Sequence, residues 1–224
     1  MMLSKRLACV ASFVDDGAFI ADVGSDHAQV PLFLFDAKRI RGAEAIENKK
    51  GPYGRMAKAI LSSPYADRTI LSLSDGISSI DPQVDTVILA GMGGRLIEEI
   101  LCRDPQKLSR VNTLIVDAHS EREELYAFLG RLSFEIVGES FFFDQGIAYD
   151  VVKALKRGKP IIYSEKECRF GPLNLQHKNP DFIAFWSAKA RHLEELLKLP
   201  DLSKENTEAY RKELISLQEV LHEH

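Results

Sequence analysis

The fold is signalled most clearly by the stretch Ala18-Phe19-Ile20-Ala21-Asp22-Val23-Gly24-Ser25-Asp26-His27-Ala28. It starts as a short apolar run and passes through an acid and a glycine into a polar loop. A strand in a sheet that is covered by helices on both sides has this pattern, because both of its faces are buried. We therefore predict a buried parallel strand, with an amphipathic helix before it over residues 3–13 and another after it over about residues 30–38.

The same alternation continues along the chain. Further strands are predicted at residues 42–47, 69–73, 85–90 and 114–116, and further helices at residues 52–62, around Leu96–Leu101 and from about Ser120 to Leu132. Ser120 and Glu123 have the spacing of a capping box at the start of the last of these helices. The regular succession of strands and helices is typical of a doubly wound α/β sheet.

Two β-rich runs, Phe134–Phe143 and Ile147–Leu155, follow without room for a helix between them. The turn Asp144-Gln145-Gly146 joins them, so they are predicted to form an antiparallel hairpin at one edge of the sheet. NAD-binding Rossmann domains more often continue with parallel strands. The predicted fold class is therefore an α/β, Rossmann-like sheet, parallel with an antiparallel edge hairpin, which favours the class I methyltransferase variant.

The stretch Arg157-Gly158-Lys159-Pro160 is the predicted junction between two units, residues 1–157 and residues 161–224. In the second unit, Asn179 with Pro180 is typical of a helix start, and Ser203 is suited to cap the next helix. Apolar side chains recur at alternating spacings of four and three residues in both segments, and Pro200 separates the two. We predict a small C-terminal helical hairpin with a coiled-coil-like seam.

The composition is that of an ordinary globular protein with one main core and an appendage. The chain has 224 residues, of which 45% are hydrophobic and 28% charged, and 29 basic against 33 acidic residues give a net charge of −4. No apolar run approaches the roughly 18 residues that span a bilayer, so we expect a cytoplasmic protein without a membrane partner. Three cysteines without a C-x-x-C pair and six histidines without an H-E-x-x-H motif predict no metal site.

Polar residues and glycines occupy the ends of successive predicted strands. They are Asp22, Gly24, Ser25 and Asp26 after the first strand, Glu47 after the second, Asp75 and Gly76 after the third, and Ala90, Gly91, Met92, Gly93 and Gly94 after the fourth. Ligands of open α/β sheets bind beyond the carboxyl ends of the strands, so these residues are predicted to converge on one crevice. Glu47 is placed to accept hydrogen bonds from ribose hydroxyls, which indicates an adenosine cofactor.

The charge of the first loop selects among adenosine cofactors. A G-x-G-x-x-G loop holds a pyrophosphate with backbone amides, but here Asp26 and Gln29 stand at the second and third glycine positions. A carboxylate repels phosphate charges, so NAD and FAD are disfavoured. S-adenosylmethionine carries a sulfonium and an ammonium instead, which suits a loop edged by Asp22 and Asp26. Asp75 is then placed to accept the adenine amino group, and Gly91 and Gly93 leave space for the methionine portion.

Each of these residues also has a purely structural interpretation. Asp22 and Asp26 are residue types that cap turns and helices, and Gly91-Met92-Gly93-Gly94 has the composition of a flexible strand-to-helix turn. Glu47 taken alone discriminates little between the two interpretations. The coincidence of all of them at consecutive strand ends is what favours a binding site.

The residues resemble those of a known family, the bacterial tRNA (adenine-22-N1)-methyltransferases. The resemblance runs nearly end to end and rests on Leu3-Ser4-Lys5-Arg6-Leu7, Asp22 to Ala28 with Pro31, Glu47-Asn48, Gly51-Pro52-Tyr53, Ala90 to Gly94, and Arg169-Phe170-Gly171-Pro172. It implies a class I enzyme that uses S-adenosylmethionine, acts on tRNA and carries a C-terminal helical arm. It also implies that Gly24, Ser25 and Asp26 surround the methionine moiety, that Glu47 and Asn48 belong to the cofactor site, and that Gly91 to Gly94 follow the cofactor and the target base.

Two departures from the family pattern fall outside the cofactor residues. Asp117-Ala118-His119 stands after the fifth strand, where the family usually shows Gln-Pro-Asn, and Gln29 replaces the aromatic residue expected after Ala28. Both changes concern the expected target-base pocket.

The reaction that the resemblance implies needs alignment and electrostatics. Adenine N1 attacks the methyl group with a lone pair and needs no deprotonation, and methylation leaves a cation on the base. A carboxylate at the base edge, Asp26 or Asp117, would stabilise the developing charge. His27 and His119 are candidates for contacting the base, although a lone histidine is more often structural. Asp26, His27 and Asp117 are the predicted catalytic residues.

Residues near the predicted crevice include several candidates for RNA contacts. Tyr53 or Met92 is suited to stack on an exposed adenine, and the basic side chains suited to phosphates are Lys5, Arg6, Lys49, Lys50, Arg55 and Arg95. A merely solvated surface is the alternative for these charges. We expect a monomer or a weak homo-oligomer. The alternative functions are methylation of another substrate and a non-catalytic RNA-binding module that retains the cofactor fold.

Overall fold

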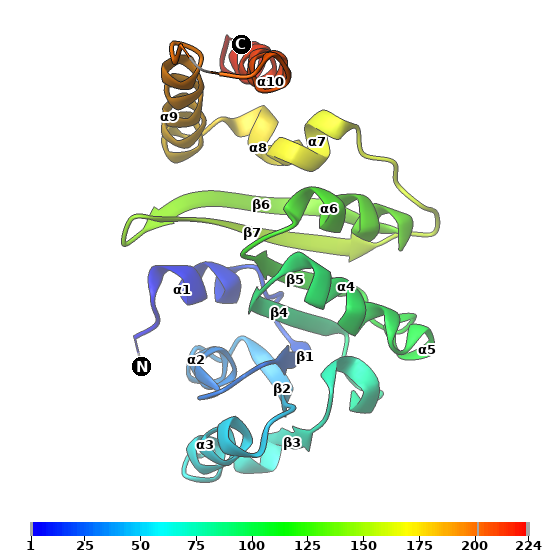
Figure 1. The fold of residues 1–224 in the computed structure, drawn as a ribbon. Coiled ribbons are helices and arrows are strands. Elements are labelled where there is room, and N and C mark those ends of the chain that lie inside the picture. The colour runs from blue at the N-terminus through cyan, green and yellow to red at the C-terminus, as the bar shows by residue number, and fades with distance from the viewer. Residues whose placement is uncertain (1, 201, 223–224) are drawn as a thin grey trace.

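In the computed structural model, which describes residues 2–200 and 202–222, seven strands form one sheet in the order β3-β2-β1-β4-β5-β7-β6 (Figure 1). The strands are β1 (Ala18–Val23), β2 (Ile40–Glu47), β3 (Thr69–Leu73), β4 (Thr86–Met92), β5 (Thr113–Ala118), β6 (Phe134–Asp144) and β7 (Ile147–Lys156). The first five are parallel, and β7 runs antiparallel to both β5 and β6. The predicted parallel sheet and its edge hairpin are confirmed.

Helices cover both faces of the sheet. They are α1 (Lys5–Ser12), α2 (Gln29–Asp36), α3 (Lys50–Leu61), α4 (Gly94–Cys102), α5 (Pro105–Leu108) and α6 (Arg122–Arg131), with short 3-10 turns at Ala66–Arg68 and Gly76–Ser79. Side chains alternate between the faces, so Ile20 of β1 packs with α1 and α2, whereas Ala21 packs on the side of α4 and α6. This two-sided burial explains why the parallel strands are continuous apolar runs.

The start of α6 differs from the prediction. The expected capping box of Ser120 and Glu123 is wrong, because the helix begins at Arg122 and its N-cap residue is Glu121, which has a left-handed backbone with φ of 51°. Ser120 Oγ donates instead to the Glu121 carboxylate at 2.9 Å. The carbonyls of Ser120 and Glu121 lie so close to Gly94 that a Cβ there would be 2.5 Å from Glu121 O. The glycine therefore lets the start of α4 pack against this loop.

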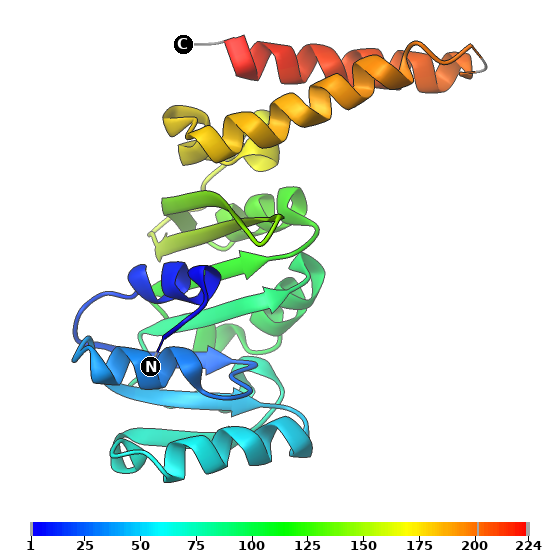
Figure 2. The same ribbon diagram turned by 90° about the vertical axis from the view of Figure 1, so that its left-hand side faces the viewer.

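The C-terminal helices α9 (Pro180–Leu196) and α10 (Lys204–His222) form the predicted helical hairpin, here called the helical arm, which extends away from the sheet (Figure 2). The Asn179 side chain accepts from Phe182 N and the Ser203 side chain accepts from Asn206 N, as the expected caps. Trp186 of α9 and Leu217 of α10 belong to one buried cluster, together with Phe141 of β6.

Two short helices that the sequence did not predict, α7 (Glu165–Phe170) and α8 (Pro172–His177), connect the sheet to the arm. Here Glu139 of β6 accepts hydrogen bonds from the backbone N–H groups of Leu173 at 2.9 Å and Asn174 at 2.7 Å. Gly171 between the helices has φ of 87°, and a side chain there would collide with the Glu139 carboxylate. Part of the motif Arg169-Phe170-Gly171-Pro172 thus serves to dock the arm on β6.

Candidate cofactor and target-base site

A cavity of about 180 Å³ lies at the carboxyl ends of β1, β2, β3 and β4. β1 lies between β2 and β4 in the sheet, so the strand order reverses there. Doubly wound sheets bind ligands at the carboxyl ends of the strands beside such a switch point. The lining residues are Val23, Gly24, Ile46, Glu47, Asn48, Lys49, Ser74, Asp75, Gly76, Met92, Leu96 and Ile100. The structure thus brings together predicted residues from the ends of four strands around one cavity. Asp22, Ser25, Asp26, Ala90, Gly91 and Gly93, which were also predicted for the cofactor site, are not among its lining residues.

The loop after β1 is shaped by Gly24, whose φ is 77°. Its N–H donates to Ile46 O at 2.9 Å, which ties the loop to the end of β2. A Cβ at Gly24 would lie 2.8 Å from Met92 Cε on the opposite wall of the cavity. A side chain at position 24 would therefore strain the backbone and push Met92 out of place.

The two acids beside this loop are buried. Ser25 Oγ donates to Asp22 Oδ2 at 2.6 Å, and the backbone N–H of Asp26 donates to Glu47 Oε1 at 2.8 Å. Burial raises the pKa of Asp22 to about 6, the Ser25 hydrogen bond lowers it, and the nearby Glu47 charge raises it further. Near neutral pH the loop therefore presents negative charge in a poorly solvated place, which favours a cationic ligand.

Asp75 lies at the far side of the cavity, where β3 ends. Its carboxylate forms an ion pair with Arg103 and accepts a 3.5 Å hydrogen bond from Asn48 Nδ2. Gly76 follows with φ of 66°, and a Cβ there would lie 2.8 Å from Ile100 Cγ2. The predicted acceptor for the adenine amino group is therefore held by two side chains, of which Arg103 was not predicted.

Asp26 is oriented by Arg55 of α3. Arg55 Nε and Nη2 both donate to Asp26 Oδ1, at 3.0 and 2.7 Å, and His27 Nε2 is 3.6 Å from Asp26 Oδ2. About half of each of these side chains is exposed to solvent. The backbone of Asp26 is itself left-handed, with φ of 34°. The predicted catalytic pair Asp26 and His27 is thus adjacent, and it lies on the surface of the loop.

Asp117, the third predicted catalytic residue, lies across the sheet at the end of β5. Its side chain is fully buried, and Arg6 Nη1 of α1 donates to Oδ2 at 2.7 Å. His119 Nε2 lies 3.7 Å from the same oxygen. Gly91 adjoins this pair, because a Cβ at Gly91 would lie 3.0 Å from Arg6 Nη1.

Three of the predicted RNA-binding side chains contact other parts of the protein. Lys5 Nζ donates to Phe143 O at 2.8 Å, Arg6 pairs with Asp117, and Arg55 pairs with Asp26. Such contacts occupy at least part of the donor capacity of these side chains. Their predicted contacts to phosphates stay predictions.

The other predicted RNA contacts are more exposed. Lys49 and Lys50 are exposed at the start of α3, and Lys49 also lines the cavity. Tyr53 is half-buried against the cluster that anchors α3. Arg95 has 84% of its side chain exposed and lies 3.7 Å from Glu99. Their predicted contacts to RNA also stay predictions.

The apolar wall of the cavity was not predicted from the sequence. Leu96 and Ile100 of α4 line it, and so does Ser74 after β3. Leu96 has 44% of its surface exposed although it is a large hydrophobic residue. Its position just after the glycine-rich turn was the one signal in the sequence, since a helix that follows a binding loop commonly contributes to the site.

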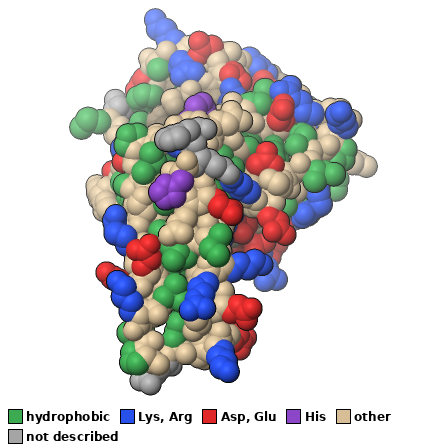
Figure 3. Space-filling model, turned by 90° about the horizontal axis from the view of Figure 1, so that it is seen from above, with side chains coloured by type: hydrophobic (Ala, Val, Ile, Leu, Met, Phe, Trp, Pro, Cys, Tyr) green, Lys and Arg blue, Asp and Glu red, His purple; other side chains and the backbone are tan. Residues whose placement is uncertain are grey.

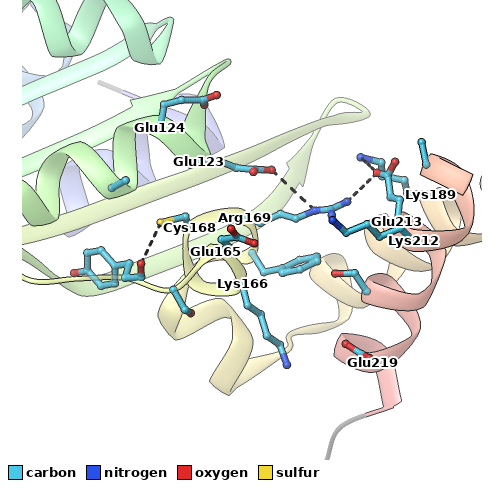
Figure 4. A pocket seen from close by; sticks show the side chains of 16 residues that line it. Glu123, Glu124, Glu165, Lys166, Cys168, Arg169, Lys189, Lys212, Glu213 and Glu219 are labelled. Carbon is cyan, nitrogen blue, oxygen red and sulfur yellow. Dashed lines mark hydrogen bonds and ion pairs between the residues drawn. The ribbon is translucent and has the colours of Figure 1, made fainter. Parts of the chain in front are cut away.

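A larger groove, of about 1190 Å³, lies between α6, α7 and α10 (Figure 4). Arg169 Nη2 and Lys189 Nζ both contact Glu213 Oε1, at 2.8 and 2.9 Å, and Arg169 Nε is 4.0 Å from Glu123. These ion pairs join the arm to the sheet domain. Acidic and basic side chains are interspersed over the surface seen from the side of the arm (Figure 3).

Within the described residues 2–200 and 202–222, no three or more His, Cys, Asp or Glu side chains are grouped so that they could hold a metal ion. In that same part of the chain, no helix has the length and apolar character needed to cross a membrane.

Comparisons with known proteins agree with this geometry. The model of the methyltransferase domain family matches residues 3–152. The tRNA (adenine(22)-N(1))-methyltransferase of Bacillus subtilis (strain 168) is 27% identical over 201 residues, which cover 88% of this chain and 84% of that protein. A candidate tRNA (m1A22) methyltransferase of Streptococcus pneumoniae, solved with S-adenosyl-L-methionine, is 33% identical with a TM-score of 0.89, and the match covers 99% of this chain and 100% of that one.

The crystal structure of the B. subtilis M1A22 tRNA methyltransferase TrmK is also similar, with 26% identity, a TM-score of 0.85 and coverage of 98% of this chain and 99% of that one. The fold, the strand-end cavity and the family match define a class I methyltransferase domain. Within that class, the chain belongs to the bacterial tRNA (adenine-22-N1)-methyltransferase family.

Proposed function

We propose that this protein transfers a methyl group from S-adenosylmethionine to N1 of the adenine at tRNA position 22. The observation that carries the proposal is the similarity to such enzymes over nearly the whole chain, including the helical arm. The cavity independently supports the same cofactor class, because Lys49 is the one basic side chain among its described lining residues and Glu47 and Asp75 are acidic. A pyrophosphate would meet carboxylates there, whereas a sulfonium and an ammonium would be attracted.

The chain's own residues divide into three roles in this proposal. Glu47 has its Oε1 occupied by the Asp26 N–H, which leaves Oε2 for ribose hydroxyls. Asp75 and Asn48 form the polar rim for the adenine moiety, against the apolar wall of Leu96 and Ile100. The loop from Gly24 to Asp26 carries the negative charge that faces the cationic part of the donor.

When bound, S-adenosylmethionine supplies an electrophilic methyl group on a positively charged sulfur. The N1–CH3 bond forms as the CH3–S bond breaks, so the positive charge moves from sulfur to the base and no proton needs to be removed. The protein therefore has to align the base, exclude water and stabilise a cation. Buried and partly buried carboxylates on the strands that flank β4 are suited to the last of these tasks.

The test uses purified protein, labelled S-adenosylmethionine and a tRNA transcript that carries adenosine at position 22. The control is the same transcript with guanosine at that position. We expect N1-methyladenosine at position 22, located by mass spectrometry of nuclease fragments, and no incorporation into the control. A methyl group at another nucleotide would point to a different target. Cofactor and RNA binding without any turnover would favour a non-catalytic RNA-binding module instead.

A further inference from the structure

Asp117 has an unusual environment for a carboxylate. It lies in β5 opposite Ala90 of β4 and Val151 of β7, and its side chain has no exposed surface. Oδ2 accepts the 2.7 Å hydrogen bond from Arg6. Oδ1 is buried as well, and no group in the described part of the chain donates a hydrogen bond to it.

A buried acceptor without a donor is costly. An ionised carboxylate has about four lone-pair sites, and leaving a buried polar atom unpaired costs roughly 1–3 kcal/mol, more for a charged group. Native proteins contain few such atoms, and they concentrate at sites that bind a ligand or carry out chemistry. Asp117 Oδ1 is therefore an acceptor that is placed in advance for a donor from outside the chain.

The groups around Asp117 have the chemistry of a base site. The rings of His119 and Tyr149 meet edge to face with centroids 5.9 Å apart, and the Arg6 guanidinium lies 5.8 Å from the centre of the Tyr149 ring. His119 is half-exposed. Gly91 adjoins Arg6 and has no side chain to fill the space. Aromatic rings and a guanidinium plane are the surfaces on which an unpaired base stacks.

This cluster is linked to the cofactor cavity through β4. The backbone N–H of His119 donates to the backbone carbonyl of Met92 at 2.9 Å. The Met92 side chain lines the cavity and faces Gly24. The cluster and the cavity therefore share the short segment from Gly91 to Met92. A base that contacts Asp117 would lie beside this segment, next to the cavity.

Asp26, the other acid that suits the base edge, is engaged differently. Arg55 binds it through two nitrogens, and the pair is half-exposed to water. An exposed, paired carboxylate contributes less to stabilising a nearby charge than a buried one, because water screens it. The buried Asp117 with its open oxygen is the stronger candidate.

We propose that Asp117 recognises the target adenine by accepting a hydrogen bond from its exocyclic N6 amino group. This inference rests on the proposed function. N6 and N1 are neighbours on one edge of adenine, so a carboxylate that holds N6 fixes N1 beside it. Guanine has an oxygen at the corresponding position, which would repel the carboxylate.

Arg6 is the counter-ion of Asp117 in the free protein. An isolated buried carboxylate would be strongly destabilising, and the ion pair with Arg6 offsets that cost. Arg6 donates to Oδ2, so the proposed hydrogen bond from N6 to Oδ1 leaves the ion pair intact. The sequence Asp117-Ala118-His119 thus forms a base site of its own, with Arg6 as its counter-ion.

The experiment combines a protein change with a substrate change. Methyl transfer under single-turnover conditions is measured for the unchanged protein and for Asp117→Ala, on tRNA with adenosine or purine riboside, which lacks the N6 amino group, at the target position. Asp117→Ala is expected to slow transfer to adenosine about 100-fold and to change transfer to purine riboside less than about threefold. Equal slowing on both substrates, or none, would overturn the proposal.

Three controls separate recognition from folding. Asp85→Ala breaks a 2.7 Å ion pair with Arg41 at the opposite end of the sheet, and its preference for adenosine over purine riboside should stay unchanged. S-adenosylmethionine affinity, measured by calorimetry, verifies the folded state of each variant. If Asp117→Ala does not fold, Asp117→Asn replaces it, with a smaller loss expected because its amide oxygen still accepts. An unchanged protein that binds the cofactor but methylates no tRNA would overturn the proposed function. An active protein whose preference for adenosine over purine riboside is unaltered in the Asp117 variants would overturn this inference alone.

Discussion

Two pairs of buried or partly buried acids in the molecule differ in what surrounds them. Asp22 and Glu47 lie at the cofactor loop, and Glu139 and Asp150 lie at the junction with the helical arm. Burial raises the pKa of Asp22 to about 6 and that of Glu139 to about 8, with the Asp150 charge as a further cause for Glu139. A raised pKa alone therefore does not distinguish a ligand site from a structural cluster.

The hydrogen bonds make the distinction. All four oxygens of the junction pair have donors: Tyr126, Leu173, Asn174 and Arg122. In the cofactor-loop pair, the donors in the described part of the chain reach one oxygen of Asp22 and one of Glu47. Satisfied acids hold a structure together, whereas acids with free acceptor capacity beside a cavity are available to a ligand.

The largest effect is expected from removing the satisfied acid. Glu139→Ala leaves the N–H groups of Leu173 and Asn174 without their acceptor and deprives Tyr126 of one, so the free energy of unfolding should fall by about 3 kcal/mol. Urea unfolding measures it. The matched control is Glu135→Ala, on the same strand in an exposed pair with Arg157, which should cost less than about 1 kcal/mol. The comparison fails if Glu139→Ala weakens S-adenosylmethionine binding by more than about twofold in protein that remains folded.

The next effect concerns the space beside Asp22 and Glu47, the acids with free acceptor oxygens. Gly24→Ala places a methyl group against Met92 Cε, and Met92 has to move within the wall of the cavity. Overpacking of this kind costs about 1–3 kcal/mol, so S-adenosylmethionine affinity should fall about 10-fold to 100-fold in calorimetry. Gly17→Ala is the control, because Gly17 has a similar positive φ of 79° and no atom within 4 Å of the added carbon. Equal affinity losses in both variants would mean that backbone strain, not the cavity, is responsible.

Much of the cofactor-loop region could be predicted because its signals are local. Each strand end carries its own polar residue or glycine within a few positions of an apolar run, and parallel topology then brings those ends together. Gly24, Glu47 and Asp75 therefore converge as expected. The hairpin of β6 and β7 was predictable for the same reason, since its turn leaves no room for a helix.

The contacts that set the charge of the site could not be predicted in this way. Arg6 and Asp117 are 111 positions apart, and Arg55 and Asp26 are 29 apart, so only the folded chain defines these pairs. The short helices α7 and α8 lack a long periodic pattern, and their position depends on Glu139 and on the backbone of Gly171. Local periodicity carries no information about such long-range pairing.

A smaller effect should appear when pH is varied. Because the folded-state pKa of Asp22 is raised from 3.8 to about 6, the protonated form stabilises the free protein below pH 3.8, and that stabilisation is lost as pH rises through 6. The affinity for the cofactor changes with pH in the opposite direction, because a cationic ligand binds more tightly when Asp22 is ionised. The dissociation constant for S-adenosylmethionine should therefore rise up to about tenfold from pH 7 to pH 5. Asp22→Asn should remove this dependence, and Asp16→Asn, at an exposed acid paired with Arg39, should retain it. A profile that persists in Asp22→Asn would assign the effect to another group.

The smallest effect should distinguish two arginines that differ, as the acids do, in how far partners within the protein already bind them. Arg55 donates two hydrogen bonds to Asp26. Arg95 is 84% exposed, and its ion pair with Glu99 is long, with 3.7 Å between Arg95 Nε and Glu99 Oε1. If Arg95 holds a phosphate, Arg95→Ala should weaken tRNA binding about threefold and lower the salt dependence of binding by about one charge. Arg55→Ala should instead slow methyl transfer, because the Asp26 carboxylate loses the two hydrogen bonds that orient it. Its effect on tRNA affinity should be smaller. Filter binding at several salt concentrations, together with single-turnover transfer rates, separates the two. The same loss of tRNA affinity in both variants would show that pairing inside the protein does not decide which arginine contacts RNA.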